Sequence, residues 1–424
     1  MKERGGTAFC FFAPYSLNML QRALLTAFLA IFLLVAPFRM LAAEALLYGI
    51  DVLASSGCEA LSGKRAGLIT NSAGLSATRE PNYRVLQRHG VDLRFLMAPE
   101  HGFSMRTAAG ETVGNLTLSD TLKVYSLYGA SKKPDSRLLK SIDVLIFDLQ
   151  DVGTRCYTYI STMRYAMEAC SDAGVAFMVL DRPNPVAPLS ASGFMLDPRF
   201  RSFVGSSEIP FLHGMTVGEI ASWLQKQHYP GLSLTVVRMK GYDRKRFADQ
   251  HAGFRFLSPS PNIRDMETVL AYPATVFLEA TEVSEGRGTD APFRMFGAPF
   301  VDGSRLKKEL DSRHLPGVVF RRVRFRPGSG KHADSICHGV RMTITDRKAY
   351  DPFRTSAAIM LAMQKLCPAQ FGLEKRSLFF DRLAGTDRYR IMVEQQRPLG
   401  EILAAAREAV RIFELHFPDR FLYP

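Results

Sequence analysis

The sequence predicts an α/β fold, in which a parallel sheet flanked by helices is followed by a smaller mixed α/β region. Between residues 65 and 180, short apolar runs alternate with amphipathic segments, as strand–helix–strand units require. The 424-residue chain is 47% hydrophobic and 22% charged, and it contains no low-complexity tract or short repeat. This composition excludes a disordered chain or a solenoid, and the length favours two domains over one.

Four strands and one helix are predicted in the first region. The strands are Arg65 to Thr70, Leu93 to Met97, Val144 to Phe147 and Ala176 to Leu180. Between the last two strands, apolar residues recur at helical spacing from Ile160 to Ala173. The segment from Val144 to Leu180 therefore predicts one strand–helix–strand crossover.

A second helix is predicted from Val217 to Lys226. Thr216 is its expected N-cap, and Glu219 completes a capping box three residues later. His213, just before this helix, is either a cleft residue or a loop residue packed on the helix, and the second interpretation is slightly favoured. The turn from Ser258 to Asn262 marks the predicted boundary between domains 44–262 and 263–424.

The second domain is predicted to contain two strands followed by two helices. The strands are Ala274 to Leu278 and Val318 to Phe325, and the helices are Thr355 to Leu366 and Leu399 to Phe413.

Residues 1–43 have the pattern of a secretory signal peptide. Ala23 to Val35 is apolar apart from one threonine, and small residues follow up to Ala45. A membrane anchor is the alternative, but Pro37 and Arg39 interrupt a stretch that is short for a span. We expect a periplasmic or secreted protein without a stable membrane span after cleavage.

The chain is basic, with a net charge of +13 that becomes +10 once residues 1–43 are removed. A basic surface suits anionic partners, of which nucleic acid and the carboxylates of bacterial cell wall are two. Export favours the wall, and the sequence lacks a dense Lys/Arg run or a reader motif. We therefore predict no nucleic-acid partner.

Several catalytic classes are excluded by missing motifs. The sequence has no G-x-S-x-G, no phosphate loop, no dinucleotide fingerprint and no metal-binding spacing among its nine histidines. Five cysteines remain after the leader, an odd number without C-x-x-C spacing, so we predict buried small residues. The sequence predicts no metal and no cofactor.

Carboxylates follow three of the predicted strands. The loops carry Glu100, then Asp148 and Asp151, then Asp181. Ligands of open α/β sheets bind at the carboxyl ends of the strands, so these loops are expected to converge on one cleft. The alternative for each loop is an acid that caps a helix or forms a turn.

The remaining polar chemistry suits a sugar substrate. Cleavage of a glycosidic bond uses paired carboxyl groups, sugar faces pack on aromatic rings, and a substrate carboxylate pairs with arginine. The candidates are Tyr128, Tyr157 and Tyr159 as platforms, Asn184 and Asn262 as amides, and Arg155, Arg182 and Arg287 as carboxylate partners.

Eight blocks in the chain resemble the exo-β-N-acetylmuramidases of the NamZ family. They are Gly49 to Asp51, Gly67 to Asn71, Pro99 to Phe103, Tyr125 to Gly129, Asp148 to Thr162, Leu180 to Pro185, Ser258 to Asn262 and Glu282 to Thr289. The resemblance implies a Rossmann-like N-terminal domain and a smaller C-terminal domain with the active cleft between them. It also implies release of N-acetylmuramic acid from the non-reducing ends of peptidoglycan fragments.

The resemblance places the catalytic acid at Glu100, in the block Pro-Glu-His-Gly-Phe. Phe95, Leu96, Pro99 and Phe103 are expected to surround this carboxyl and raise its pKa. Glu285 is the first choice for the second catalytic group and Asp151 the next, unless the substrate's own acetamido group is the nucleophile. The expected substrate contacts are His101, Arg155, Tyr157, Tyr159, Asp181, Arg182, Asn184, Asn262 and Arg287.

Two other functions remain open at this stage. One is a non-catalytic exported protein that binds muropeptides in the same cleft, and the other is a hydrolase of a different acidic amino sugar.

Overall fold

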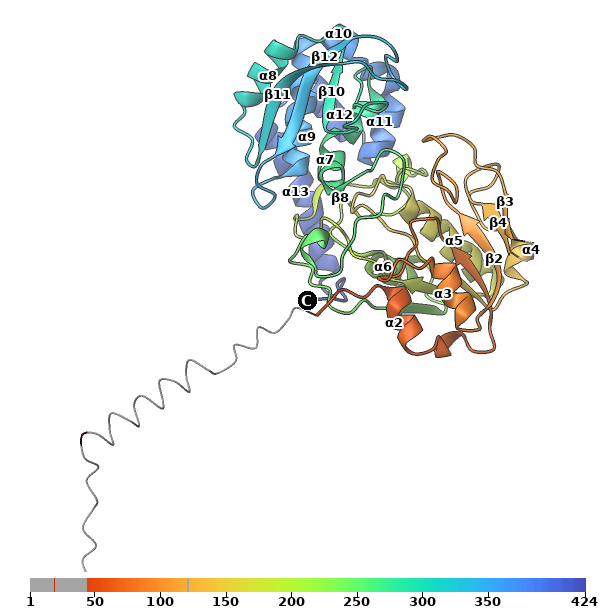
Figure 1. Cartoon of the computed structure of the whole chain (residues 1–424). Helices are drawn as coiled ribbons and strands as arrows, with labels where there is room; N and C mark the ends of the chain where they lie inside the picture. Colours follow the sequence, from red (N-terminus) through yellow and green to blue (C-terminus); the bar gives the residue numbers. More distant parts are fainter. Residues whose placement is uncertain (1–18, 20–43, 120–121) are drawn as a thin grey trace, which may run out of the picture. The chain divides into compact units, whose positions relative to one another are not determined.

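The computed structural model describes Met19, residues 44–119 and residues 122–424 (Figure 1). The predicted signal peptide, residues 1–43, lies outside the described residues apart from Met19. Residues 44–424 form one unit by their internal contacts. Within the described part of the chain, no helix combines the length and the apolar character that crossing a membrane requires.

The N-terminal half builds a seven-stranded sheet. Its strands are β1 (Arg65–Ile69), β2 (Asp92–Ala98), β3 (Leu116–Ser119), β4 (Leu122–Ser126), β5 (Val144–Phe147), β6 (Ala176–Leu180) and β9 (Leu234–Val237). The four predicted strands are confirmed to within one residue at each end. The sequence did not predict β3, β4 and β9, which lie toward the two ends of the sheet and bury fewer of their side chains.

The strand order confirms the Rossmann-like prediction. The order across the sheet is β3-β4-β2-β1-β5-β6-β9, and only the β3–β4 pair is antiparallel. Taken in chain order, the six parallel strands run third, second, first, fourth, fifth and sixth. The direction of winding therefore reverses between β1 and β5, where the loops diverge and leave a crevice.

Helices cover both faces of this sheet (Figure 1). They are α2 (Gly49–Ser55), α3 (Asn82–Arg88), α4 (Ser136–Leu139), α5 (Tyr159–Ala173) and α6 (Val217–His228). Alternate strand residues enter two separate hydrophobic clusters, as the period of two in a strand requires. Leu145 and Phe147 pack with α5 and α6, whereas Val144 and Ile146 pack with α2 and α3.

The C-terminal half contains a three-stranded antiparallel sheet and most of the remaining helices. The strand order is β10-β12-β11. The elements are α7 (Met266–Thr275), the 3₁₀ helix η4 (Val276–Ala280), β10 (Met295–Ala298), α8 (Gly303–Asp311), β11 (Val318–Phe325), β12 (Cys337–Ile344), α9 (Pro352–Leu366), α10 (Pro368–Phe371), α11 (Ser377–Ala384), α12 (Arg388–Glu394) and α13 (Leu399–His416). The prediction of β11, α9 and α13 is confirmed.

The predicted strand from Ala274 to Leu278 is wrong, because these residues belong to α7 and η4. The helix begins where the Asp265 side chain accepts a hydrogen bond from the Thr268 N–H at 2.7 Å. All five residues of the run are buried, and periodicity cannot distinguish a buried helical turn from a buried strand.

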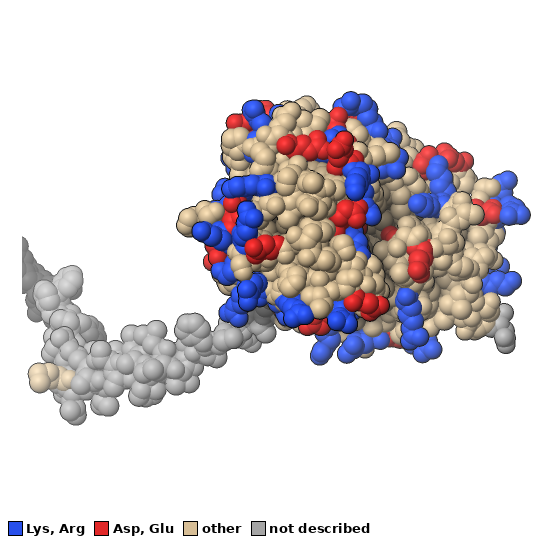
Figure 2. Space-filling view, turned by 90° about the horizontal axis from the view of Figure 1, so that it is seen from above, with Lys and Arg blue, Asp and Glu red and all other residues tan. Residues whose placement is uncertain are grey.

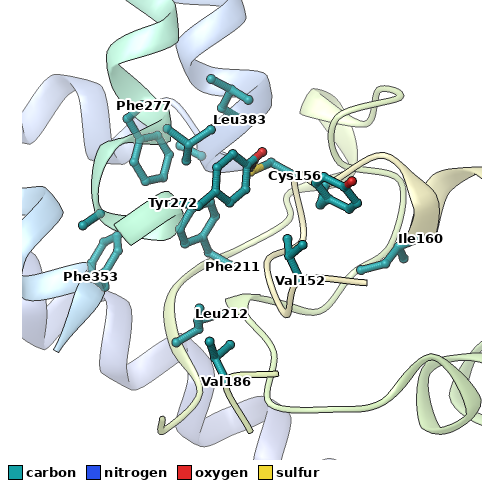
Figure 3. Close-up of a cluster of buried hydrophobic side chains, with 14 of the residues drawn as sticks. Val152, Cys156, Ile160, Val186, Phe211, Leu212, Tyr272, Phe277, Phe353 and Leu383 are labelled. Carbon is teal, nitrogen blue, oxygen red and sulfur yellow. Dashed lines mark hydrogen bonds between the residues drawn. The ribbon is translucent and has the colours of Figure 1, made fainter. Parts of the chain in front are cut away.

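One hydrophobic cluster continues from the large sheet into the C-terminal half. Figure 3 shows the contact: Phe211, from the two-stranded sheet of β7 (Ser192–Met195) and β8 (Pro210–Leu212), lies beside Tyr272 and Phe277. The ring centroids of Phe211 and Phe277 are 4.6 Å apart. Because the core is shared, loops from both halves are held in position around the site. The predicted domain boundary after Asn262 stays a prediction.

Candidate active site

A cavity of about 230 Å³ lies where loops from the large sheet meet the C-terminal half. Figure 2 shows the surface hollowed along a furrow in which acidic and basic side chains gather. The charged, hydrogen-bonding and aromatic lining residues are Glu100, His101, Tyr128, Tyr157, Thr158, Ser260, Asn262, Tyr272, Glu279, Arg287, Phe293 and Phe379. Six residues proposed for the site from the sequence are thus brought together: Glu100, His101, Tyr128, Tyr157, Asn262 and Arg287.

Glu100 reaches the cavity from the loop that follows β2. Its Oε1 accepts a hydrogen bond from the Gly110 N–H at 2.9 Å, and its Oε2 accepts one from the Thr158 hydroxyl at 2.6 Å. The Tyr128 phenol is also hydrogen-bonded to this carboxyl group. The N–H and O–H donors stabilise negative charge on a carboxylate.

Two of the apolar residues predicted to surround Glu100 pack on other aromatic rings. Phe95 packs on Tyr125 in the core, with ring centroids 5.8 Å apart, and Phe103 packs on Tyr83 at 6.2 Å. Side chains of a strand alternate between its faces, so Phe95 and Leu96 enter the hydrophobic clusters on opposite faces of the sheet.

His101 adopts the left-handed backbone conformation, with φ of 71°, and Gly102 follows at 71°. A histidine in this region costs roughly 1–3 kcal/mol, and such strain concentrates at functional sites. The His101 Nδ1 lies 2.9 Å from the Thr107 carbonyl oxygen, so Nδ1 carries the hydrogen. Burial lowers the pKa of His101, which favours a neutral ring beside Glu100.

An ion-pair chain forms the wall contributed by the C-terminal half. The Glu279 Oε1 lies 2.6 Å from the Arg287 guanidinium, which also contacts Glu285 at 3.1 Å. Lys331 contacts Glu285 at 3.1 Å and donates to the carbonyl of Leu278 at 2.6 Å. Burial raises the pKa of Glu279; Arg287 opposes this rise, and the charge of Glu285 adds to it.

Glu285 and Glu279 differ in access to the cavity. The Glu285 side chain is 5% exposed, is held by two cations and is absent from the lining, whereas that of Glu279 is 20% exposed and lines the cavity. Glu285 was the predicted second catalytic group, and Glu279 was not among the predicted site residues. The sequence feature that could have pointed to Glu279 is the clustering of three carboxyl groups, Glu279, Glu282 and Glu285, in one short segment.

Two arginines predicted to bind the substrate are occupied by the scaffold and do not line the cavity. Arg155 is 1% exposed and donates to the carbonyls of Phe194, Ile209, Leu383 and Ala384. Arg182 forms a buried ion pair with Asp148 and donates to the Leu75 carbonyl at 2.9 Å. Neither guanidinium therefore presents an N–H group to a ligand in the cavity.

Four further predicted residues hold loops together outside the cavity. Tyr159 donates to the Pro259 carbonyl at 2.6 Å, and the Asn184 amide donates to the Met215 carbonyl at 3.0 Å. Asp151 accepts from the Gly153 N–H at 2.6 Å, and Asp181 accepts from the Thr216 hydroxyl at 2.7 Å. These contacts match the turn and capping alternative considered for the acidic loops.

Aromatic rings and hydrogen-bonding groups together make the cavity suitable for a sugar. Tyr157 meets Tyr272 edge to face at 6.2 Å, and Tyr272 meets Phe293 at 4.8 Å. His213 lies outside this group, buried in the loop before α6, as the favoured interpretation expected. Across the described residues, no group of three His, Cys, Asp or Glu side chains is arranged to hold a metal ion.

Comparison with known proteins gives the same family over nearly all of residues 44–424. Residues 66–267 match the model "Exo-beta-N-acetylmuramidase NamZ, N-terminal", and residues 270–423 match "Exo-beta-N-acetylmuramidase NamZ, C-terminal". The chain is 42% identical over 367 residues to the peptidoglycan beta-N-acetylmuramidase NamZ of Bacillus subtilis (strain 168), covering 86% of this chain and 88% of the relative.

Solved structures with the same fold come from Bacteroides fragilis. One DUF1343 family protein has a TM-score of 0.83 at 33% identity, covering 90% of this chain and 99% of its own. A second has a TM-score of 0.72 at 27% identity, covering 89% and 99%. The chain belongs to the NamZ exo-β-N-acetylmuramidase family, as both of its domain models and the Bacillus relative show.

Proposed function

We propose that this protein is an exo-acting glycoside hydrolase that releases N-acetylmuramic acid from the non-reducing ends of peptidoglycan fragments during cell-wall turnover. The observation that carries the proposal is the cavity in which Glu100, Glu279 and Arg287 meet, in a member of this family. At about 230 Å³ the cavity is smaller than the roughly 300–1,000 Å³ typical of drug-sized ligands. A cavity of this size favours one terminal sugar over the middle of a polymer.

The chemistry of the cavity fits glycoside hydrolysis. Two carboxyl groups supply the acid and the carboxylate that an oxocarbenium-like transition state requires, and the tyrosines offer faces for the sugar ring. The substrate's acetamido group is an alternative nucleophile, in which case a carboxylate orients it. Arg287 is the candidate cation to bind the lactyl carboxylate, because its side chain lines the cavity.

A chromogenic N-acetylmuramic acid glycoside tests the activity. The wild-type protein is expected to release the chromophore, and Glu100→Gln is expected to reduce kcat/KM by roughly 10²–10⁴-fold. Glu282→Gln is the matched control, because Glu282 pairs with Arg376 away from the cavity lining and its loss should leave the rate unchanged. Undiminished turnover by the Glu100 variant would contradict the proposal.

Exo-action has its own test. Peptidoglycan fragments that begin with N-acetylmuramic acid should yield that sugar alone at early times. Fragments whose terminal 4-hydroxyl is blocked should resist digestion. Early release of longer oligosaccharides would contradict exo-action.

We further propose that residues 1–43 direct export to the periplasm or the medium. The charged start, apolar segment and small residues of this stretch support the proposal, as does a substrate located outside the cytoplasmic membrane. N-terminal sequencing of the protein recovered from cells should find a mature end near Glu44. Recovery of the uncleaved chain from the cytoplasm would contradict it.

A further inference from the structure

Glu279 shares the cavity with Glu100, although the two residues come from different halves of the chain. Glu100 follows β2 of the large sheet, whereas Glu279 lies in η4 beyond the predicted boundary. Among the described residues that line the cavity, these two are the ones that carry carboxyl groups. The charges of Glu100 and Arg287 both act on the pKa of His101, Glu100 raising it and Arg287 lowering it. Since Arg287 is the ion-pair partner of Glu279, His101 lies between the two sides of the cavity.

The two carboxyl groups have different hydrogen-bond environments. Glu100 receives donors on both oxygens, from Gly110 and from Thr158. Glu279 is bonded through Oε1 to Arg287, and no residue in the described part of the chain donates to its Oε2. Glu279 therefore has one oxygen that can carry a hydrogen, in a side chain that lines the cavity.

The charge balance around Glu279 also differs. Arg287 is shared between Glu279 and Glu285, and Glu285 has Lys331 as a second cation. A shared cation stabilises the charge of Glu279 less than a cation of its own would. Burial raises the pKa of Glu279, with the charge of Glu285 adding to the rise. A carboxyl in such a site suits proton donation, as in other pairs of acids whose environments differ.

We infer that Glu279 is the catalytic acid of this site and that Glu100 is the carboxylate that faces the anomeric carbon. The inference rests on the proposed function. Glu279 then has the role that the resemblance to the family implied for Glu100.

The proposed step conserves atoms and charge. Glu279 gives its proton to the glycosidic oxygen as the bond from that oxygen to the anomeric carbon breaks, and the bonding electron pair stays with the departing oxygen. Glu100 stabilises the positive charge that develops at the anomeric carbon, or orients the acetamido group that attacks it. Water then supplies a hydroxyl to the anomeric carbon and loses its other proton to a carboxylate of the pair.

The dependence on the leaving group separates the two roles. A sugar leaving group needs protonation, whereas a dinitrophenolate leaves without it. The experiment compares kcat/KM of the wild type, Glu279→Gln and Glu100→Gln on an N-acetylmuramic acid–N-acetylglucosamine disaccharide and on the dinitrophenyl glycoside. Glu279→Gln should lose roughly 10²–10⁴-fold on the disaccharide and far less on the dinitrophenyl glycoside. Glu100→Gln should lose comparable factors on both substrates.

Each other outcome has a definite reading. If Glu279→Gln loses the same factor on both substrates, or none on either, the inference is overturned while the proposed function stands. If Glu100→Gln shows the split, the roles are the reverse of those inferred. If the wild type hydrolyses neither substrate, the proposed function fails and the inference with it.

The pH profile gives a second readout that a purely structural role would not produce. The wild type should lose disaccharide activity as pH rises and Glu279 deprotonates. In Glu279→Gln the residual disaccharide activity should lack that alkaline limb, and its persistence would contradict the acid role. If the Gln variant does not fold, Glu279→Ala replaces it, and the same difference between the two substrates is expected. Equal losses on both substrates contradict the acid role.

Discussion

Arg155 is among the largest fully buried side chains of the described residues, and its guanidinium donates to four backbone carbonyls. Two of these carbonyls, from Leu383 and Ala384, lie more than 220 residues away in the sequence. Burial lowers the pKa of Arg155 to about 10, which still leaves it charged near neutral pH. This side chain joins the loop after β5 to the end of α11.

Arg155→Met should destabilise the fold by about 3–5 kcal/mol, because it leaves buried carbonyls without donors. Urea unfolding followed by circular dichroism measures the free energy. Arg137→Met is the control: the Arg137 side chain is 88% exposed in its ion pair with Asp135, and its removal should leave the free energy of unfolding nearly unchanged. Equal midpoints for the two variants would contradict the scaffold role.

At the scale of elements, α6 begins with the capping box that the sequence predicted. The Thr216 hydroxyl accepts from the Glu219 N–H at 3.2 Å, and Glu219 accepts from the Thr216 N–H at 2.8 Å. The same hydroxyl donates to Asp181 at 2.7 Å, so the helix start is also tied to the end of β6.

Thr216→Ala should cost about 1–2 kcal/mol of stability, the upper part of the range for an N-cap, because two hydrogen bonds are lost. Thr216→Ser keeps the hydroxyl and should cost much less. Thermal unfolding compares the two variants with the wild type. A Ser variant as unstable as the Ala variant would show that the methyl group matters and the cap does not.

At the scale of the whole described unit, the C-terminus closes the fold back onto the large sheet. The Tyr423 hydroxyl donates to Asp181 at 2.7 Å, and the Leu422 N–H donates to Glu219 at 2.7 Å. Burial raises the pKa of Asp181 to about 6, although the hydrogen bonds from Tyr423, Gly218 and Thr216 oppose this. The last residues of the chain are thus coupled to the loop after β6.

The raised pKa of Asp181 predicts a pH dependence of stability. The folded state holds the Asp181 proton more tightly than the unfolded state, in which the carboxyl has its ordinary pKa of 3.8. As the pH rises from about 4 to about 6, the contribution of Asp181 to stability therefore falls. The full change is about 3 kcal/mol. Relative to Asp181→Asn, the wild type should therefore lose stability as the pH rises through this window. Above pH 6 the difference in stability between the two proteins should stay constant. Unfolding free energies of both proteins at pH 4, 5, 6 and 7 measure the difference, and a difference independent of pH would contradict the assignment.

Local patterns in the sequence were sufficient for much of the fold. The strands β1, β2, β5 and β6 and the helices α5 and α6 follow from the spacing of apolar residues and from a capping box, which depend only on near neighbours. The resemblance to the family placed Glu100 in a loop after a strand, and the structure places that loop at the cavity. The strands β3, β4 and β9 were missed because few of their side chains are buried.

Only the tertiary structure decided which polar residues reach the cavity. Glu279 and Glu285 lie six residues apart and look alike in sequence, but Lys331, 46 residues beyond Glu285, joins Arg287 in holding it away from the lining. From the sequence, Arg155 was a candidate to bind a substrate carboxylate. In the folded chain its guanidinium donates to carbonyls at the end of α11 instead. The direction of a side chain depends on partners brought close by folding, and the spacing of residues along the chain does not encode those partners.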